Sequence, residues 1–255
     1  MSAENGALVA RLARRERLLG TFSLISATEV VELIALAGFD LVIIDMEHGP
    51  HELGQVRDAI VAAAGRGLAT VVRVRQLEPA LIGAVLDLGA SGVLVPQITS
   101  AADARRAVRA ARFAPDGERG ANPWVRASGY GSRKNWFADA NQEVAVLVMV
   151  EGATALADLP GILAVPGLTG IFLGPVDLSH ALGVPGELDH PVVVSALERA
   201  VEQAEAAGVA VGVFSAELGA VTRWWSRGVR LVATGVDTGL IGGAFADAVR
   251  IARSG

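Results

Sequence analysis

The stretch Phe39-Asp40-Leu41-Val42-Ile43-Ile44-Asp45-Met46-Glu47-His48 decides the fold, because a run of apolar residues ends abruptly in polar ones. The same layout recurs where residues 69–72 lead to Arg73, residues 144–150 to Glu151 and residues 170–174 to Pro175 and Asp177. Runs rich in Val, Ile and Leu without alternation are typical of parallel strands that are covered on both faces. If these runs are strands of one barrel, their ends share one face, and barrel enzymes carry their active sites there.

The whole chain predicts eight strands, each followed by a helical segment. We expect the strands at residues 20–23, 39–45, 69–74, 92–95, 144–150, 170–173, 209–214 and 229–233. Residues 5–18 predict an opening helix, residues 239–253 an apolar closing helix, and residues 113–141 one long irregular stretch. This pattern favours a (β/α)₈ TIM barrel that forms a single domain over residues 1–255. A doubly wound open sheet is the alternative, but the first strand lacks the Gly-rich phosphate loop usual in that fold.

The composition excludes several classes of protein. The net charge of −5 speaks against nucleic acid as the main partner, and the absence of cysteine excludes disulfides and thiolate chemistry. No apolar run approaches the roughly 18–20 residues that span a bilayer, and the first residues lack a signal-peptide layout. We therefore expect a cytoplasmic protein without a membrane partner. The single lysine, Lys134, lies in a polar predicted loop, which makes Schiff-base chemistry less favoured than metal chemistry.

Two carboxylates end neighbouring predicted strands, Glu151 and Asp177. Carboxylates from adjacent strand ends suit a hard divalent cation such as Mg²⁺ or Mn²⁺, which keeps positions open for water or a chelating substrate. The alternative is that each carboxylate caps the helix that follows it. Residues 234–239, after the last strand, predict either a phosphate- or carboxylate-binding loop or a Gly-rich turn.

A histidine and an arginine accompany these carboxylates. His48 follows Asp45 by three residues and could act as a general base if Asp45 or Asp87 orients it; a loop histidine bonded to the backbone is the alternative. Arg73 could hold a substrate carboxylate or an oxyanion. Arg75 lies on the same side of the strand by parity, so the pattern leaves both arginines open.

At these residues the chain resembles the HpcH/HpaI family of metal-dependent pyruvate aldolases. The resemblance covers nearly the whole chain. Its blocks are Phe39 through Pro50, Val71-Val72-Arg73, Leu94-Val95-Pro96-Gln97, Arg119-Gly120, Arg126-Ala127 with Tyr130-Gly131, Gly174-Pro175-Val176-Asp177-Leu178-Ser179 and Thr234-Gly235-Val236-Asp237.

The resemblance implies an aldehyde-lyase that reversibly cleaves 4-hydroxy-2-oxo acids to pyruvate, or a related 2-oxo acid, and an aldehyde. The reaction would pass through an enolate stabilised by Mg²⁺, Mn²⁺ or Co²⁺, with Glu151 and Asp177 as metal ligands. The resemblance also implies a hexamer, often a trimer of dimers, with C-terminal helices swapped between subunits.

The same resemblance implies roles for the remaining polar residues. His48 would be the base, acting directly or through metal-bound water. Asp87 would raise the basicity of His48, and Asp45 would support it. Arg73 would steady the enolate or alkoxide oxygen.

Two positions depart from the family pattern. Many members carry Gln at the position of Met149, and Ala or Ser at the position of Val176. With Phe214 at the end of the seventh strand, these residues predict a bulkier and less polar substrate pocket than one built for sugar acids. Another reaction through the same enolate, such as decarboxylation or biosynthetic C–C bond formation, remains an alternative, as does a binding barrel without catalysis.

Overall fold

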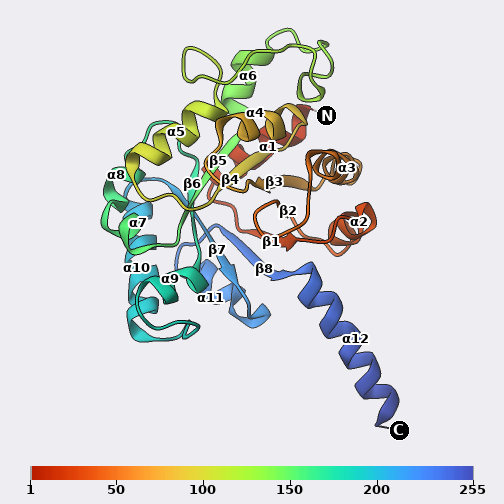
Figure 1. Ribbon diagram of the computed structural model, residues 1–255, viewed down its shortest axis with the longest axis vertical. Coiled ribbons are helices and arrows are strands. Elements are labelled where there is room, and N and C mark those ends of the chain that lie inside the picture. Colours follow the sequence, from red (N-terminus) through yellow and green to blue (C-terminus); the bar gives the residue numbers. More distant parts are fainter. Residues whose placement is uncertain (1, 255) are drawn as a thin grey trace.

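Eight parallel strands form a closed barrel in chain order in the computed structural model, which describes residues 2–254 (Figure 1). Met1 and Gly255, the ends of the predicted domain, lie outside the described residues. The strands are β1 (Leu18–Ser23), β2 (Leu41–Asp45), β3 (Ala69–Arg73), β4 (Gly92–Val95), β5 (Ala145–Val150), β6 (Gly170–Leu173), β7 (Ala210–Ser215) and β8 (Leu231–Val236). Strand β1 pairs with both β2 and β8, so the predicted (β/α)₈ barrel is confirmed.

Most helices follow a strand and pack around the barrel; the first helix precedes β1 and the last projects away (Figure 1). They are α1 (Ser2–Ala13), α2 (Thr28–Leu36), α3 (Leu53–Ala64), α4 (Pro79–Asp87), α5 (Ala101–Ala111), α6 (Trp136–Glu143), α7 (Ala153–Ala157), α8 (Leu159–Leu163), α9 (Pro175–Ala181), α10 (Pro191–Ala206), α11 (Val221–Ser226) and α12 (Asp237–Arg253), with short 3₁₀ turns η1 (Arg126–Ser128) and η2 (Leu218–Ala220). No helix within residues 2–254 combines the length and the apolar character needed to cross a membrane.

Side chains alternate between the inside and the outside of the barrel. On β2, Leu41 and Ile43 belong to the cluster that fills the barrel, whereas Val42 and Ile44 pack outward against the helices. On β3, Val71 points inward and belongs to the same interior cluster as Leu41 and Ile43. Because successive strand residues face opposite sides, Asp45 and Arg73 share the inward parity. The alternation therefore places the side chains of Asp45 and Arg73 in the interior, at the carboxyl end of the barrel.

The opposite end of the barrel is closed by α1, whose Leu8 and Leu12 join the interior cluster. This helix ends at Ala13, five residues earlier than predicted. Leu18 is fully buried and pairs with Leu231 of β8, so strand pairing overrides the helical pattern there. The predicted irregular stretch 113–141 also contains most of α6, where Trp136 packs edge-to-face on Phe113.

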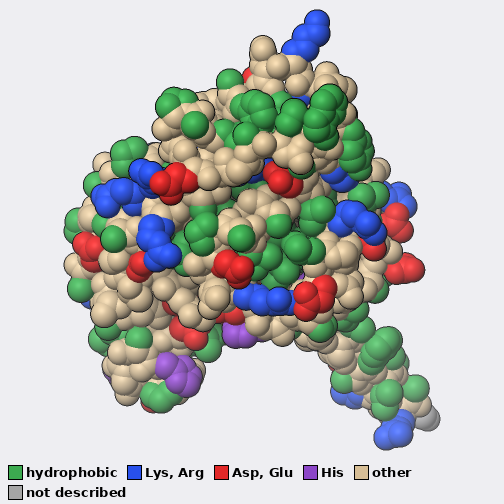
Figure 2. All heavy atoms as spheres, turned by 45° about the horizontal axis from the view of Figure 1, so that its top comes forward, with side chains coloured by type: hydrophobic (Ala, Val, Ile, Leu, Met, Phe, Trp, Pro, Cys, Tyr) green, Lys and Arg blue, Asp and Glu red, His purple; other side chains and the backbone are tan. Residues whose placement is uncertain are grey.

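The C-terminal helix α12 projects away from the barrel (Figure 1). Its exposed apolar side chains include Phe245, Val249 and Ile251, with Phe245 69% exposed. Figure 2 shows hydrophobic side chains along this projecting helix beside basic ones. Such an apolar stretch standing clear of the fold is typical of a contact surface for another chain.

Candidate active site

The register of β2 and β3 places Asp45 directly beside Arg73. The two side chains form a double hydrogen bond, with Nε of Arg73 2.9 Å from Oδ1 and Nη2 2.5 Å from Oδ2. Asp45 is fully buried and Arg73 is 8% exposed. Burial opposes the charge of Arg73, but the hydrogen bond and charge of Asp45 raise the pKa of its guanidinium above the ordinary value. Arg73 is thereby fixed as a permanent cation.

Asp45 also organises the turn after β2. Its Oδ1 accepts hydrogen bonds from the backbone N–H groups of Glu47 (3.0 Å) and His48 (3.3 Å). The side chain of His48 is 65% exposed, and its Nε2 lies 4.0 Å from Oε2 of Glu47. Asp45 thus holds the backbone of His48, while the carboxylate nearest to the imidazole nitrogen comes from Glu47.

Glu47 and Gln97, for which the sequence predicted no role, connect Arg73 to Glu151. Oε2 of Glu47 lies 3.2 Å from Nη1 of Arg73, and its Oε1 accepts a hydrogen bond of 3.0 Å from Nε2 of Gln97. The backbone N–H of Gln97 donates to Oε1 of Glu151 at 2.6 Å. Gln97 has a left-handed backbone (φ 57°), which directs its N–H toward that carboxylate. Glu47 and Gln97 each lie two residues after the end of a buried strand, and this position in the sequence was the signal that could have identified them.

Glu151 and Asp177 lie close enough for their charges to interact. Burial raises the pKa of Glu151, and the negative charges of Asp177 and Glu47 raise it further. The hydrogen bond from the Gln97 N–H and the positive charge of Arg73 act in the opposite direction, but the net effect is a raised pKa. A Cβ placed on Gly174 would come within 3.1 Å of the Cβ of Glu151. Glycine there lets the end of β6, and the helix α9 that carries Asp177, approach Glu151.

The charge balance of this end of the barrel is negative. In the cluster that the described residues form around Arg73, the four carboxylates of Asp45, Glu47, Glu151 and Asp177 outnumber this one guanidinium. Such a surplus in a partly buried site fits a bound cation, and carboxylate oxygens are the donors that hard divalent ions prefer. Within residues 2–254 there is no group of three or more His, Asp or Glu side chains arranged around one ion. A cation held by Glu151 and Asp177 would therefore complete its coordination with water or substrate.

A cavity of about 270 Å³ lies beside these groups. Its polar lining consists of Asp45, His48, Arg73 and Asp177, and its apolar lining includes the three residues expected to shape the pocket, Met149, Val176 and Phe214. The rings of Phe172 and Phe214 both meet Phe22 edge-to-face, with centroids 6.0 and 5.8 Å away. The lining of the space next to the charged cluster is therefore mostly apolar.

Two further predicted candidates lie outside this cavity. Arg75 pairs with Glu52 at 2.6 Å on the surface, so the structure separates it from Arg73. Asp87 pairs with Arg119 at 2.6 Å and lines a separate cavity along α4 and α5. Asp87 does not line the cavity that His48 lines, and its action on His48 stays a prediction.

Residues 234–239, predicted as a loop, form the end of β8 and the start of α12. The buried carboxylate of Asp237 accepts hydrogen bonds from the hydroxyl of Ser23 and the backbone N–H groups of Leu24 and Ile25, at 2.9–3.0 Å. Asp237 thus already occupies the donors that a bound phosphate or carboxylate would use. Neither the predicted binding loop nor the predicted Gly-rich turn is present at these described residues, because β8 continues directly into α12.

Comparisons with known proteins agree on one family. The profile described as HpcH/HpaI aldolase/citrate lyase matches residues 18–244. A hydroxypyruvate/pyruvate aldolase from Paraburkholderia phytofirmans is 37% identical over 243 residues, which are 93% of this chain and 94% of that protein. A 4-hydroxy-2-oxo-heptane-1,7-dioate aldolase from Salmonella heidelberg is 40% identical over 221 residues, 86% of this chain and 84% of that one. The crystal structure of an HpcH/HpaI aldolase/citrate lyase family protein from Burkholderia cenocepacia matches with a TM-score of 0.93 and 36% identity, covering 97% of this chain and 99% of that one. The chain belongs to the HpcH/HpaI aldolase/citrate lyase family.

Proposed function

We propose that this protein is a divalent-metal-dependent aldolase, a carbon–carbon lyase that cleaves 4-hydroxy-2-oxo acids to pyruvate, or a related 2-oxo acid, and an aldehyde. The relatives named above as aldolases support the reaction class. The observation that carries the proposal is the gathering of Arg73, Glu151 and Asp177 at one end of the barrel. Arg73, Asp177 and His48 line the cavity there. Pyruvate release that requires a divalent ion tests it, and activity that survives complete chelation would contradict it.

Glu151 and Asp177 would hold the cation in this proposal, with Mg²⁺, Mn²⁺ or Co²⁺ as the expected ions. When bound, the cation supplies Lewis-acid stabilisation for negative charge that develops on the 2-oxo oxygen. The backbone N–H of Gln97 orients Glu151, and Gly174 leaves room for it.

Arg73 and His48 would do the work of binding and proton transfer. Arg73 has Nε and Nη2 committed to Asp45. Its Nη1, which also lies 3.2 Å from Oε2 of Glu47, would steady a substrate oxyanion. His48 takes the proton from the 4-hydroxyl group while the C3–C4 bond breaks, leaving the aldehyde and the enolate of the 2-oxo acid. Return of that proton to C3 yields pyruvate and restores the neutral imidazole, so atoms and charge balance.

The lining of the cavity predicts a preference among aldehyde acceptors. Met149, Val176 and Phe214 offer no hydrogen bonds to the hydroxyl groups of a sugar aldehyde, which would lose their water on binding. We expect apolar aldehydes to react with pyruvate or hydroxypyruvate with a kcat/KM about 10-fold higher than polyhydroxylated aldehydes of equal length. A steady-state screen under each divalent ion measures this ratio, and a clear preference for the polyhydroxylated series would refute the prediction.

The exposed face of α12 supports a hexameric assembly in which this helix docks on a neighbouring copy. We expect Phe245→Asp to lower the mass in solution below that of six chains, because a charge would be buried in an apolar contact. Light scattering after gel filtration measures the mass. Phe245→Leu keeps the apolar surface and should keep the wild-type mass, and an unchanged mass for Phe245→Asp would contradict the role of this face.

A further inference from the structure

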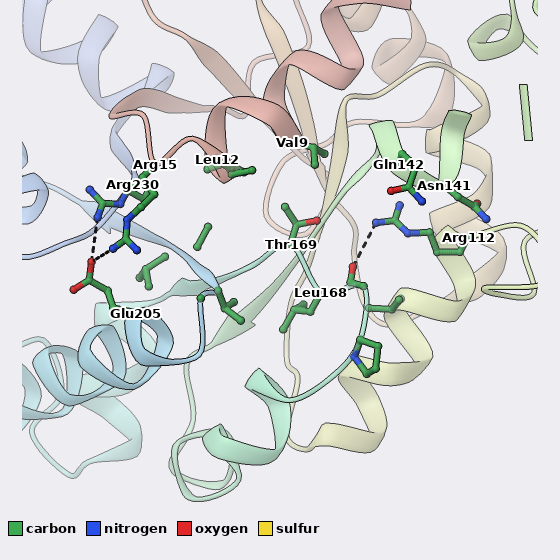
Figure 3. Close-up of a pocket in the computed structure, with 18 of the residues that line it drawn as sticks. Val9, Leu12, Arg15, Arg112, Asn141, Gln142, Leu168, Thr169, Glu205 and Arg230 are labelled. Carbon is green, nitrogen blue, oxygen red and sulfur yellow. Dashed lines mark hydrogen bonds and ion pairs between the residues drawn. The ribbon is translucent and has the colours of Figure 1, made fainter. Parts of the chain in front are cut away.

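A second cavity, of about 580 Å³, lies where the strands begin, at the end of the barrel opposite the charged cluster (Figure 3). It is bounded by Val9 and Leu12 of α1 and by residues that enter β6, β7 and β8, such as Thr169 and Arg230. Among the described residues it shares no lining residue with the cavity beside Arg73. A volume of this size accommodates a small organic molecule.

Arg112, the residue that follows α5, sits in the wall of this cavity and is 7% exposed. Its Nη1 donates to the carbonyl oxygen of Val144 at 2.9 Å and its Nη2 to that of Gly167 at 3.4 Å. Burial, with the positive charge of Arg119, lowers the pKa of Arg112 to about 10. Two backbone carbonyl groups are the hydrogen-bond acceptors for this buried charge, and the charge of Asp116 partly offsets the effect of burial on its pKa.

The other two deeply buried arginines have carboxylate partners. Arg73 is paired with Asp45, and Arg119 with Asp87. Arg112 has no carboxylate within ion-pair distance among residues 2–254, and the nearby Asp116 instead accepts a hydrogen bond from the side chain of Asn141 at 2.9 Å. An unpaired buried guanidinium is costly, so this site is suited to an anion that comes from outside the chain.

Apart from Arg112, the charges of the cavity wall balance one another, and the wall also offers apolar surface. Arg15 and Arg230 both contact Oε1 of Glu205, at 2.5 and 3.0 Å, at the side of the cavity opposite Arg112 (Figure 3). Counting the charged groups that line the cavity, three arginines face the two carboxylates Asp116 and Glu205. Between the two charged sides lie Val9, Leu12 and Leu168.

We propose that this cavity binds a small aliphatic carboxylate, whose carboxyl group pairs with Arg112 and whose chain lies against Val9, Leu12 and Leu168. Arginine is the side chain best suited to bind a carboxylate through parallel N–H groups. Because α1 forms one wall and the barrel the other, the ligand connects the two and stabilises the fold, while the chemistry stays at the far end. This site goes beyond the proposed aldolase function and does not depend on it.

The test compares hexanoate with hexanamide, its uncharged analogue of the same shape, on the protein with saturating Mg²⁺. Hexanoate should bind saturably in a calorimetric titration and raise Tm by about 5 °C at ~100 times its Kd, because a ligand of the native state stabilises it by mass action. Hexanamide should do neither. Absence of saturable hexanoate binding, or equal binding of the amide, would overturn the proposal.

Variants locate the site. Arg112→Gln should abolish the Tm rise, and Arg112→Lys, which keeps the charge but loses the fork of N–H groups, should weaken binding about 10-fold. Arg106→Gln, at an exposed position on α5, is the matched control and should bind as the wild type does. Glu151→Gln should also bind normally, since it alters only the opposite end of the barrel. Binding that survives in both Arg112 variants, or that is lost in Glu151→Gln, would assign hexanoate to another site and sink the proposal.

Discussion

Replacing Glu151 by Gln is expected to reduce metal-dependent pyruvate release by about 10³-fold or more. The substitution removes one of the two carboxylates proposed to hold the cation, and Lewis-acid stabilisation accounts for several kcal/mol of such a barrier, each 1.4 kcal/mol being tenfold in rate. The measurement is kcat/KM for pyruvate release across a range of Mg²⁺ and Mn²⁺ concentrations. Glu202→Gln, an exposed position on α10, is the matched control and should retain wild-type activity. Retention of more than a tenth of the activity at saturating metal would remove Glu151 from the proposed role.

The same variant should remain folded, because the amide keeps the size of the side chain and can still accept the hydrogen bond from Gln97. Burial and the neighbouring charges raise the pKa of Glu151 above its ordinary 4.5. The folded state therefore holds this proton more tightly than the unfolded chain does. That contribution to stability is present below the unfolded pKa and is lost as the pH rises through the folded pKa. Metal-free wild type should thus lose stability relative to Glu151→Gln as the pH rises from below 4.5, which unfolding curves at a series of pH values would reveal.

Replacing Arg73 by Gln is expected to damage both stability and catalysis. It leaves the fully buried Asp45 without its cation, and breaking a buried ion pair costs about 3–5 kcal/mol. It also removes the proposed oxyanion partner, so kcat/KM should fall by about 10²–10³-fold in the fraction that remains folded. Urea unfolding gives the free energy, and steady-state kinetics gives the rate.

Arg75→Gln is the natural control for this experiment, since Arg75 lies two residues away and pairs with Glu52 at the surface. Its effect on stability should be within about 1 kcal/mol, because exposed ion pairs contribute little. Arg73→Lys should recover part of the stability but little of the activity, since a lysine cannot form the double hydrogen bond to Asp45. Equal effects of the Arg73 and Arg75 substitutions would contradict the central position given to Arg73.

The barrel could be predicted from the sequence because its strands are continuous apolar runs that end in polar residues. The parity of β2 and β3 sends Asp45 and Arg73 inward, and the shared strand-end face brings Glu151 and Asp177 near them. Pattern alone could not choose between Arg73 and Arg75, since the choice depends on β3 ending at Arg73.

Other features depend on tertiary contacts that no local pattern carries. The opening helix stops at Ala13 because Leu18 is taken into strand pairing with β8. Gln97 approaches Glu151 through a left-handed backbone, and Asp87 pairs with Arg119, two contacts that the pattern does not reveal. The single-domain organisation of residues 1–255 and the cytoplasmic location stay predictions.

The most direct test of the account is the position of the metal ion. Crystals grown with Mn²⁺ and measured with anomalous scattering should show one strong peak bonded to carboxylate oxygens of both Glu151 and Asp177, and the peak should vanish in Glu151→Gln. A peak that contacts only one of the two residues, or a wild-type crystal at saturating Mn²⁺ with no peak at this end of the barrel, would contradict it.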